Sequence, residues 1–220
     1  MSDLSATEAL ERLREGNKRF VSGHPAERSL SGPALRDELV SGQTPIATIL
    51  GCSDSRVPAE IVFDQTLGDL FVIRVAGNIV APSQVGSIEF AADRFGTQLV
   101  VVLGHSQCGA VEATIEELER PRESRSPNMS LLVERIRPSV QTLFETELVN
   151  DHELLVRQAV RANIRASVNH LRHGSQILEQ LIQERRLLVV GAEYSLETGV
   201  VDFFDEIPDS GAQPASEWTS

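Results

Sequence analysis

The chain has 220 residues and a formal net charge of −12, because 32 Asp and Glu residues outnumber 20 Lys and Arg residues. Such an acidic chain is a poor partner for nucleic acid or for anionic membranes, since both are bound through cationic side chains. No run of about 18 apolar residues predicts a membrane-spanning helix, and the N-terminus lacks the apolar stretch of a signal peptide. Two cysteines, Cys52 and Cys108, cannot build a disulfide framework, so we expect a reducing, cytoplasmic location.

Two helices are predicted in the first part of the chain. Ser5-Ala-Thr-Glu8 is a capping box, which predicts a helix start, and Gly23 is placed to end that helix. Pro33 predicts the first turn of a second, short helix. Neither helix shows an obvious internal partner for its apolar face.

Short apolar runs then predict strands that are buried on both faces. They span residues 46–51, 70–76, 98–105 and 187–194, and residues 200–204 are predicted to form an edge strand. Helices are predicted over 82–96, 110–120 and in a block over 130–183, which Pro138 should bend or break and in which Gly174 should end one segment. This alternation predicts an α/β fold with a mostly parallel central sheet covered by helices.

We expect residues 1–220 to form a single domain. Residues 1–44 would be its N-terminal helical arm. Residues 120–128 read as a polar linker, and residues 208–220 as a mobile tail, because that segment is polar and has no apolar pattern.

Three side chains that bind metals fall at the ends of predicted strands. Cys52 follows the first strand, His105 ends the third, and Cys108 opens the next helix. Ligands collect at the carboxyl ends of strands in such sheets. Two thiolates and one imidazole suit zinc, and three protein ligands leave a fourth position open, as in catalytic sites. The residues alone leave a catalytic zinc site, a cysteine nucleophile and two inert thiols as alternatives.

The segments CSDSR (52–56) and HSQCGA (105–110) together resemble the paired motifs of the β-class carbonic anhydrases. The resemblance extends over residues 5–205 and is strongest over 43–110. It implies a zinc-dependent lyase that interconverts carbon dioxide and water with bicarbonate and a proton. It also implies a homodimer or homotetramer whose N-terminal helices pack on a neighbouring subunit, with an antiparallel strand at the edge of the sheet.

Further site residues follow from the resemblance. Asp54 would accept a hydrogen bond from the reacting group, and Arg56 would hold its carboxylate in a bidentate fork. In some relatives the aspartate instead becomes a fourth zinc ligand in a closed site. Phe90 stands where relatives often have Tyr, and Ala76 where they often have Val. The positions that match substrate-binding residues are Gln43 (typically reaching the site of the neighbouring chain), Phe71, Ala76, Phe90 and Gly109.

The resemblance also indicates a subgroup and an expected pH dependence. A regulated subgroup has Trp three residues before the first zinc cysteine, whereas this chain has Ile49 there and its one Trp is Trp218, so we expect the plant-like subgroup. Because two thiolates cancel the charge of zinc, activity should rise from about pH 7 toward pH 9.

Two other functions use the same ligands. One is hydrolysis of carbonyl sulfide or carbon disulfide, and the other is a zinc-stabilised module without catalysis. The Asp54–Arg56 pair argues against the second. A thiol redox protein is disfavoured because the chain has no Cys-x-x-Cys motif.

Overall fold

The structure is a computed structural model that describes residues 4–26, 32–120 and 126–205. Within these residues, strands β2, β1, β3, β4 and β5 form one sheet in that order. β2, β1, β3 and β4 are parallel and β5 is antiparallel to β4, which confirms the predicted mostly parallel sheet with an antiparallel edge. The strands are β1 (Ala47–Gly51), β2 (Leu70–Arg74), β3 (Leu99–His105), β4 (Leu188–Tyr194) and β5 (Val201–Asp205).

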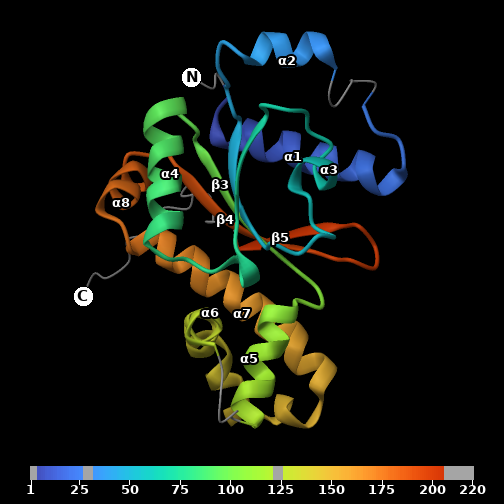
Figure 1. Ribbon diagram of the computed structural model, residues 1–220, viewed down its shortest axis with the longest axis vertical. Helices are drawn as coiled ribbons and strands as arrows, with labels where there is room; N and C mark the ends of the chain where they lie inside the picture. The colour runs from blue at the N-terminus through green and yellow to red at the C-terminus, as the bar shows by residue number, and fades with distance from the viewer. Residues whose placement is uncertain (1–3, 27–31, 121–125, 206–220) are drawn as a thin grey trace, which may run out of the picture.

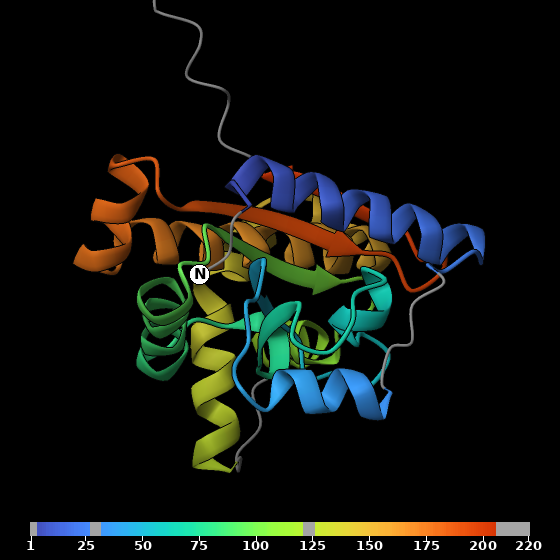
Figure 2. The same cartoon turned by 90° about the horizontal axis from the view of Figure 1, so that it is seen from above.

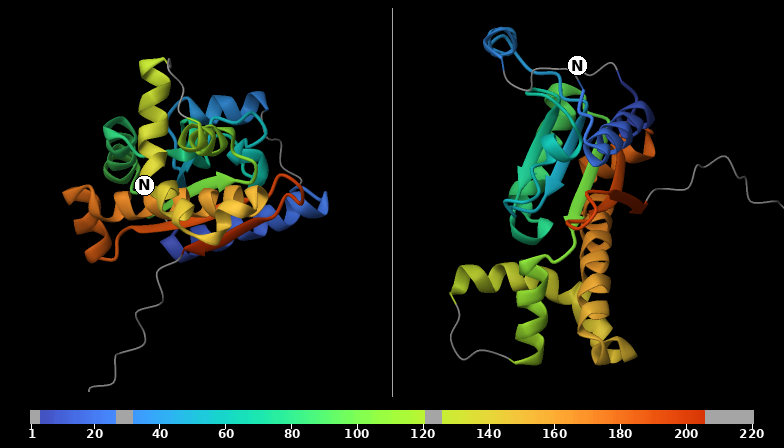
Figure 3. Two further views of the ribbon diagram at one scale, coloured as in Figure 1. Left: turned by 90° about the horizontal axis from the view of Figure 1, so that it is seen from below. Right: turned by 90° about the vertical axis from the view of Figure 1, so that its right-hand side faces the viewer.

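Helices lie on both faces of this sheet (Figure 1). The α-helices are α1 (Ala6–Ser22), α2 (Pro33–Leu39), α3 (Ala59–Val62), α4 (Pro82–Phe95), α5 (Gly109–Glu119), α6 (Pro127–Gln141), α7 (His152–His173) and α8 (Gln176–Gln183), and the short 3₁₀ helices are η1 (Ala76–Asn78), η2 (Thr142–Glu145) and η3 (Glu147–Asn150). α1 and α3 pack on one face, and α4, α7 and α8 on the other. α5, α6 and the first half of α7 extend beyond one end of the sheet (Figure 3).

Alternate residues of the central strands supply two separate cores. Leu50 and Val102 belong to the core beneath α4, α7 and α8, whereas Ile49 and Val101 belong to the core beneath α1 and α3. All four side chains have no exposed surface. Because both faces are covered, the central strands are continuously apolar rather than alternating, which is the pattern that made them recognisable in the sequence.

The first N-terminal helix packs on its own chain. Its predicted capping box is present, with the amide of Glu8 donating to Ser5 Oγ at 3.3 Å, and Gly23 ends the helix with a φ of 72°. Leu10 and Leu13 are buried in the core that β1, β3 and α3 share. The expectation that this helix lacks an internal partner is therefore wrong, because its partner surface exists only once the sheet and α3 have formed.

The second N-terminal helix behaves differently. α2 buries none of its residues. It stands clear of the sheet in the view from above (Figure 2). Val40, at its C-terminal end, is 86% exposed. Leu35 and Leu39 are only half-buried, Leu39 beside Gly68, so within the described residues most of the apolar face of α2 stays uncovered.

The predicted helical block is divided into α6, η2, η3, α7 and α8, but not at Pro138. α6 continues through Pro138 to Gln141, so the expected break is wrong at this position. Pro138 lies in the last turn of α6, where its missing amide frees only the carbonyl of Glu134, an exposed residue that water can reach. α7 ends at Gly174, as predicted.

Two predicted segments fall partly or wholly outside the described residues. Residues 121–125 of the predicted linker and the whole predicted tail, 208–220, are not described. Among the described residues, no helix is both long and apolar enough to cross a bilayer.

Candidate metal centre

The structure brings the three predicted metal ligands together. Cys52 directly follows β1, His105 is the last residue of β3, and Cys108 caps α5. β1 and β3 are neighbouring parallel strands, so their carboxyl ends meet at one edge of the sheet. One ligand atom from each residue lies within 4.8 Å of the others, and the three residues are 5%, 0% and 1% exposed. This is a buried Cys-His-Cys cluster of a size that one metal ion can span.

The imidazole of His105 has its free nitrogen buried. Nδ1 lies 2.9 Å from the carbonyl oxygen of Ser106, which can only accept, so Nδ1 carries the hydrogen of this bond. Nε2 is then the nitrogen whose lone pair is available in the neutral ring, and among the described residues it has no hydrogen-bond partner. A buried polar atom without a partner is costly, and a metal ion would satisfy it. The donor set and this nitrogen both fit zinc.

The two thiols differ in their ionisation. Hydrogen bonding with Cys108, together with the adjacent imidazole of His105 and a hydrogen bond from the Gly77 amide, lowers the pKa of Cys52 to about 4 despite its burial. The Gly77 N–H donates to Cys52 Sγ at 3.3 Å. The same contact with the Cys52 thiolate, and then burial, raise the pKa of the Cys108 thiol. Burial opposes a charged His105, but the adjacent thiolate outweighs it and raises the pKa of the imidazole. The contacts therefore favour ionisation of Cys52 over Cys108.

The turn that supplies the Gly77 amide is fixed by α7. Gly77 has a φ of 71°, a conformation that glycine adopts without strain, and a Cβ built there would lie 2.7 Å from Ile136 Cδ1. Asn163 Nδ2 donates to the Gly77 carbonyl at 2.7 Å, and Ser167 Oγ donates to the Asn78 carbonyl at 3.0 Å. The RVAGN segment therefore forms a second wall of the cluster.

Asp54 and Arg56 form the bidentate pair that the sequence predicted. Arg56 Nε and Nη2 donate to the two carboxylate oxygens of Asp54 at 3.0 and 2.8 Å, and the Arg56 amide donates to Oδ1 at 2.9 Å. Asp54 Oδ2 lies 3.9 Å from His105 Nε2, so the carboxylate borders the cluster. The Arg56 guanidinium holds the pKa of Asp54 well below its usual range, so Asp54 is ionised.

Arg74 is a site residue that sequence reasoning missed. Its guanidinium donates to the carbonyl oxygens of Cys52 and Asp54, at 3.0 and 2.5 Å, and so fixes the loop that carries them. The available signal was a single cation, the fifth residue of the otherwise apolar run 70–76.

The residues matched to substrate positions separate into two groups. Ala76 precedes Gly77 beside Cys52, and Gly109 begins α5 directly after Cys108, so both adjoin the cluster. Phe71 pairs in register with Thr48, four residues before Cys52, which places it about 13 Å back along the strands.

Phe71 belongs to an aromatic cluster instead. Its ring centroid is 6.2 Å from that of Phe90 and 5.8 Å from that of Phe95, and Phe90 is 53% exposed. Gln43 is also exposed and precedes β1, whereas Cys52 follows β1. Within one chain, the structure therefore does not bring Gln43, Phe71 and Phe90 to the metal ligands.

Comparisons with known proteins agree with this site. A family model described as carbonic anhydrase matches residues 47–201. Carbonic anhydrase of Mycolicibacterium smegmatis is 36% identical over 211 residues, covering 96% of this chain and 99% of the relative. Carbonic anhydrase 2 of Mycobacterium tuberculosis is 36% identical over 217 residues, covering 97% and 100%.

A solved structure has the same fold. A tetrameric β-carbonic anhydrase from Sordaria macrospora superposes with a TM-score of 0.70 at 26% identity, covering 79% of this chain and 87% of that one. The fold, the paired motifs and these relatives agree: the chain belongs to the carbonic anhydrase family, in its β class, whose members are lyases that interconvert carbon dioxide and bicarbonate.

Proposed function

We propose that this chain catalyses carbon dioxide hydration with a zinc ion held by Cys52, His105 and Cys108. The observation that carries the proposal is the buried, unpartnered Nε2 of His105 beside two thiols. Zinc bound there supplies a Lewis acid that makes water a good nucleophile at mild pH. Both cysteines are free, and zinc needs them reduced, so the proposal places the protein in the cytoplasm.

Asp54 and Arg56 act together as an orienting pair in this proposal. Asp54 is ionised and both of its oxygens are bonded to Arg56, so it accepts a hydrogen bond and has no proton to give. By accepting from the attacking water, it turns a lone pair of that water toward the carbon of carbon dioxide. Service as a fourth zinc ligand would require Asp54 to leave Arg56, and that closed state stays a prediction.

The substrate contacts divide between two subunits. Ala76 and the Gly109 amide serve the site of their own chain, since both adjoin the cluster. Gln43, Phe71 and Phe90 serve the site of a neighbouring chain, and the protein is a homo-oligomer. Three observations support this assignment: the exposure of Phe90, the open edge of β2, and the absence of buried residues in α2. The Sordaria macrospora neighbour is tetrameric.

The test combines metal analysis, carbon dioxide hydration and sedimentation. We expect about one zinc per chain, stopped-flow hydration that needs the metal, and an oligomer at micromolar concentration. A His105→Ala, Cys108→Ser double variant should lose zinc and activity together. Full zinc occupancy in that variant would refute the ligand assignment, and a fully active monomer would refute the shared site.

A further inference from the structure

The loop that carries two of the metal ligands is held by a turn far away in the sequence. Residues 195–200, between β4 and β5, lie beside the loop from His105 to Cys108. The Ser106 amide donates to the Tyr194 carbonyl at 3.0 Å, and the Leu196 amide donates to Ser106 Oγ at 3.0 Å. The loop is therefore tied to the end of β4 through both the backbone and the side chain of Ser106.

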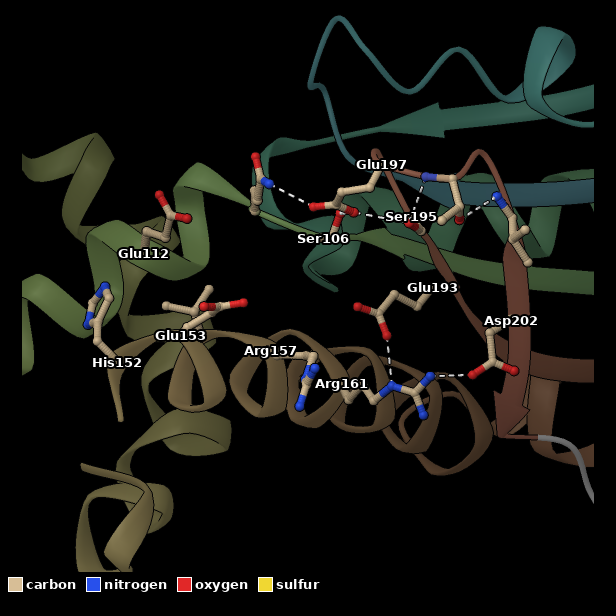
Figure 4. A pocket seen from close by; sticks show the side chains of 14 residues that line it. Ser106, Glu112, His152, Glu153, Arg157, Arg161, Glu193, Ser195, Glu197 and Asp202 are labelled. Carbon is tan, nitrogen blue, oxygen red and sulfur yellow. Dashed lines mark hydrogen bonds and ion pairs between the residues drawn. The ribbon is translucent and has the colours of Figure 1, made fainter. Parts of the chain in front are cut away.

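One carboxylate completes this tie. Glu197 accepts from Ser106 Oγ at 2.9 Å, from Ser195 Oγ at 3.0 Å and from Gln107 Nε2 at 2.7 Å. Hydrogen bonds from its own amide and from the two serines lower its pKa, so the side chain is a carboxylate that only accepts. Two of these contacts come from Ser106 and Gln107, the residues that separate His105 from Cys108, and Figure 4 shows Glu197 beside Ser106 and Ser195.

Gln107 needs a restraint of this kind. Its backbone φ is 55°, in the left-handed region that residues other than glycine rarely adopt. Without contacts that hold it, the loop would therefore relax out of this conformation. The Gln107 side chain is bonded to Glu197, and its carbonyl accepts from Arg56 Nη2 at 3.5 Å. A relaxed Gln107 would move the sulfur of Cys108 and would also turn the Ser106 carbonyl that orients the His105 ring.

We propose that Glu197 is a positioning residue for the metal centre: by holding Ser106 and Gln107, it fixes the separation and orientation of the His105 and Cys108 ligand atoms. The inference rests on the proposed zinc site. Glu197 touches neither the ligands nor the substrate, and it acts through the backbone of the loop between them. Removing a group that is hydrogen-bonded directly to a metal ligand commonly lowers metal affinity about 10- to 100-fold, and Glu197 acts one residue further out, so the lower end of this range applies.

The cavity beside Glu197 supplies a matched control. Glu197 lines a cavity of about 640 Å³ with Glu112, Glu153, Arg157 and other side chains (Figure 4). Glu153 is an exposed carboxylate of the same cavity at the start of α7, and no hydrogen bond joins it to the metal loop among the described contacts. Glu153→Ala thus removes the same charge from the same cavity without touching the loop.

The experiment measures zinc affinity by competition with a chromophoric chelator, together with the absorption spectrum of the cobalt(II)-substituted protein. Glu197→Ala should weaken zinc binding about 10-fold and shift the thiolate–cobalt bands, whereas Glu153→Ala should change neither. Glu197→Gln keeps the shape and one acceptor oxygen, and the serine hydroxyls can rotate to accept from its amide, so it should recover most of the affinity. Wild-type zinc affinity and cobalt spectrum in Glu197→Ala would overturn the proposal, as would an equal loss in Glu153→Ala.

Hydrogen exchange keeps the test independent of the proposed function and of stability. In the metal-free protein, Glu197→Ala should speed amide exchange at Ser106, Gln107 and Cys108 without speeding it in the centre of β3. Unchanged amide exchange in the loop would refute the positioning role of Glu197 even if the wild-type protein bound no zinc. A wild-type protein without zinc would instead refute the ligand assignment.

Discussion

Replacing Gly77 by Ala perturbs the wall of the metal cluster by one methyl group. The new Cβ would lie 2.7 Å from Ile136 Cδ1 and 3.1 Å from Ala110 Cβ, at a backbone φ of 71°. The left-handed conformation costs about 1 kcal/mol for alanine, and the crowding of a fully buried Ile136 costs about 2 kcal/mol. The sum of about 3 kcal/mol should lower the Tm of the metal-free protein by about 6–12 °C for a chain of this size.

The same substitution should weaken zinc binding. Relief of the contact with Ile136 moves the Gly77 amide away from Cys52 Sγ, and a hydrogen bond to a charged acceptor contributes about 1.5–3 kcal/mol, which corresponds to about 10- to 100-fold in affinity. Gly86→Ala is the control, because Gly86 lies in α4 with nothing within 4 Å of its Cβ position. That variant should gain about 0.5–1 kcal/mol of stability.

The assays are thermal unfolding by circular dichroism and zinc competition with a chelator. Opposite signs of the stability change in Gly77→Ala and Gly86→Ala are the expected signature of a conformational requirement at residue 77. If Gly77→Ala matched the wild type in both Tm and zinc affinity, neither the strained backbone nor the amide–sulfur bond would matter to the site.

Three further predictions concern the remaining parts of the site. Arg56→Lys should keep zinc but lower carbon dioxide hydration about 10- to 100-fold, because lysine cannot reproduce the fork on the carboxylate; wild-type turnover by stopped flow would contradict it. In the metal-free protein, mass-spectrometric mapping should find that the alkylation rate of Cys52 does not change with pH from 6 to 9, because a thiol with its pKa lowered to about 4 is already ionised there. Cys108, whose pKa is raised, should stay protonated and unreactive. Equal labelling of the two cysteines would show that they do not share one negative charge in this way. Phe90→Glu should shift sedimentation toward the monomer and reduce activity with zinc retained, whereas Ile177→Glu, at a similarly exposed position (54%), should not; an intact oligomer in Phe90→Glu would place the subunit contact elsewhere.

Much of the fold could be predicted from the sequence because the local apolar pattern of each strand agrees with its burial in the folded chain. The strands around Ile49, Val101 and Val190 are apolar without alternation, which is the mark of a sheet covered on both faces. The ligands Cys52 and His105 follow or end such strands, so their meeting at one edge follows from parallel topology alone.

The missed features depend on contacts that no local pattern carries. The surface on which α1 packs exists only after the sheet and α3 have formed. Whether α6 can contain Pro138 depends on where that helix ends. Arg74 and Glu197 act through hydrogen bonds to other elements, which lie 20–22 and 90–91 residues away in sequence. The spacing of residues within one segment does not indicate hydrogen bonds to distant segments.

The hydrogen bonds of Asn17 join α1 to the turn before β5 and to the first residue of β5. This residue of α1 donates to the Gly199 carbonyl at 2.9 Å and accepts from the Val201 amide at 2.9 Å, across 182 and 184 residues of sequence. Closing so long a loop is entropically unfavourable and cannot occur before β5 has been synthesised. During synthesis the three ligands leave the ribosome long before the turn around Glu197, which holds the loop between His105 and Cys108. Formation of the proposed metal centre is thereby coupled to synthesis of residues 195–201, and a chain truncated before residue 195 would lack the contacts that hold the loop from His105 to Cys108.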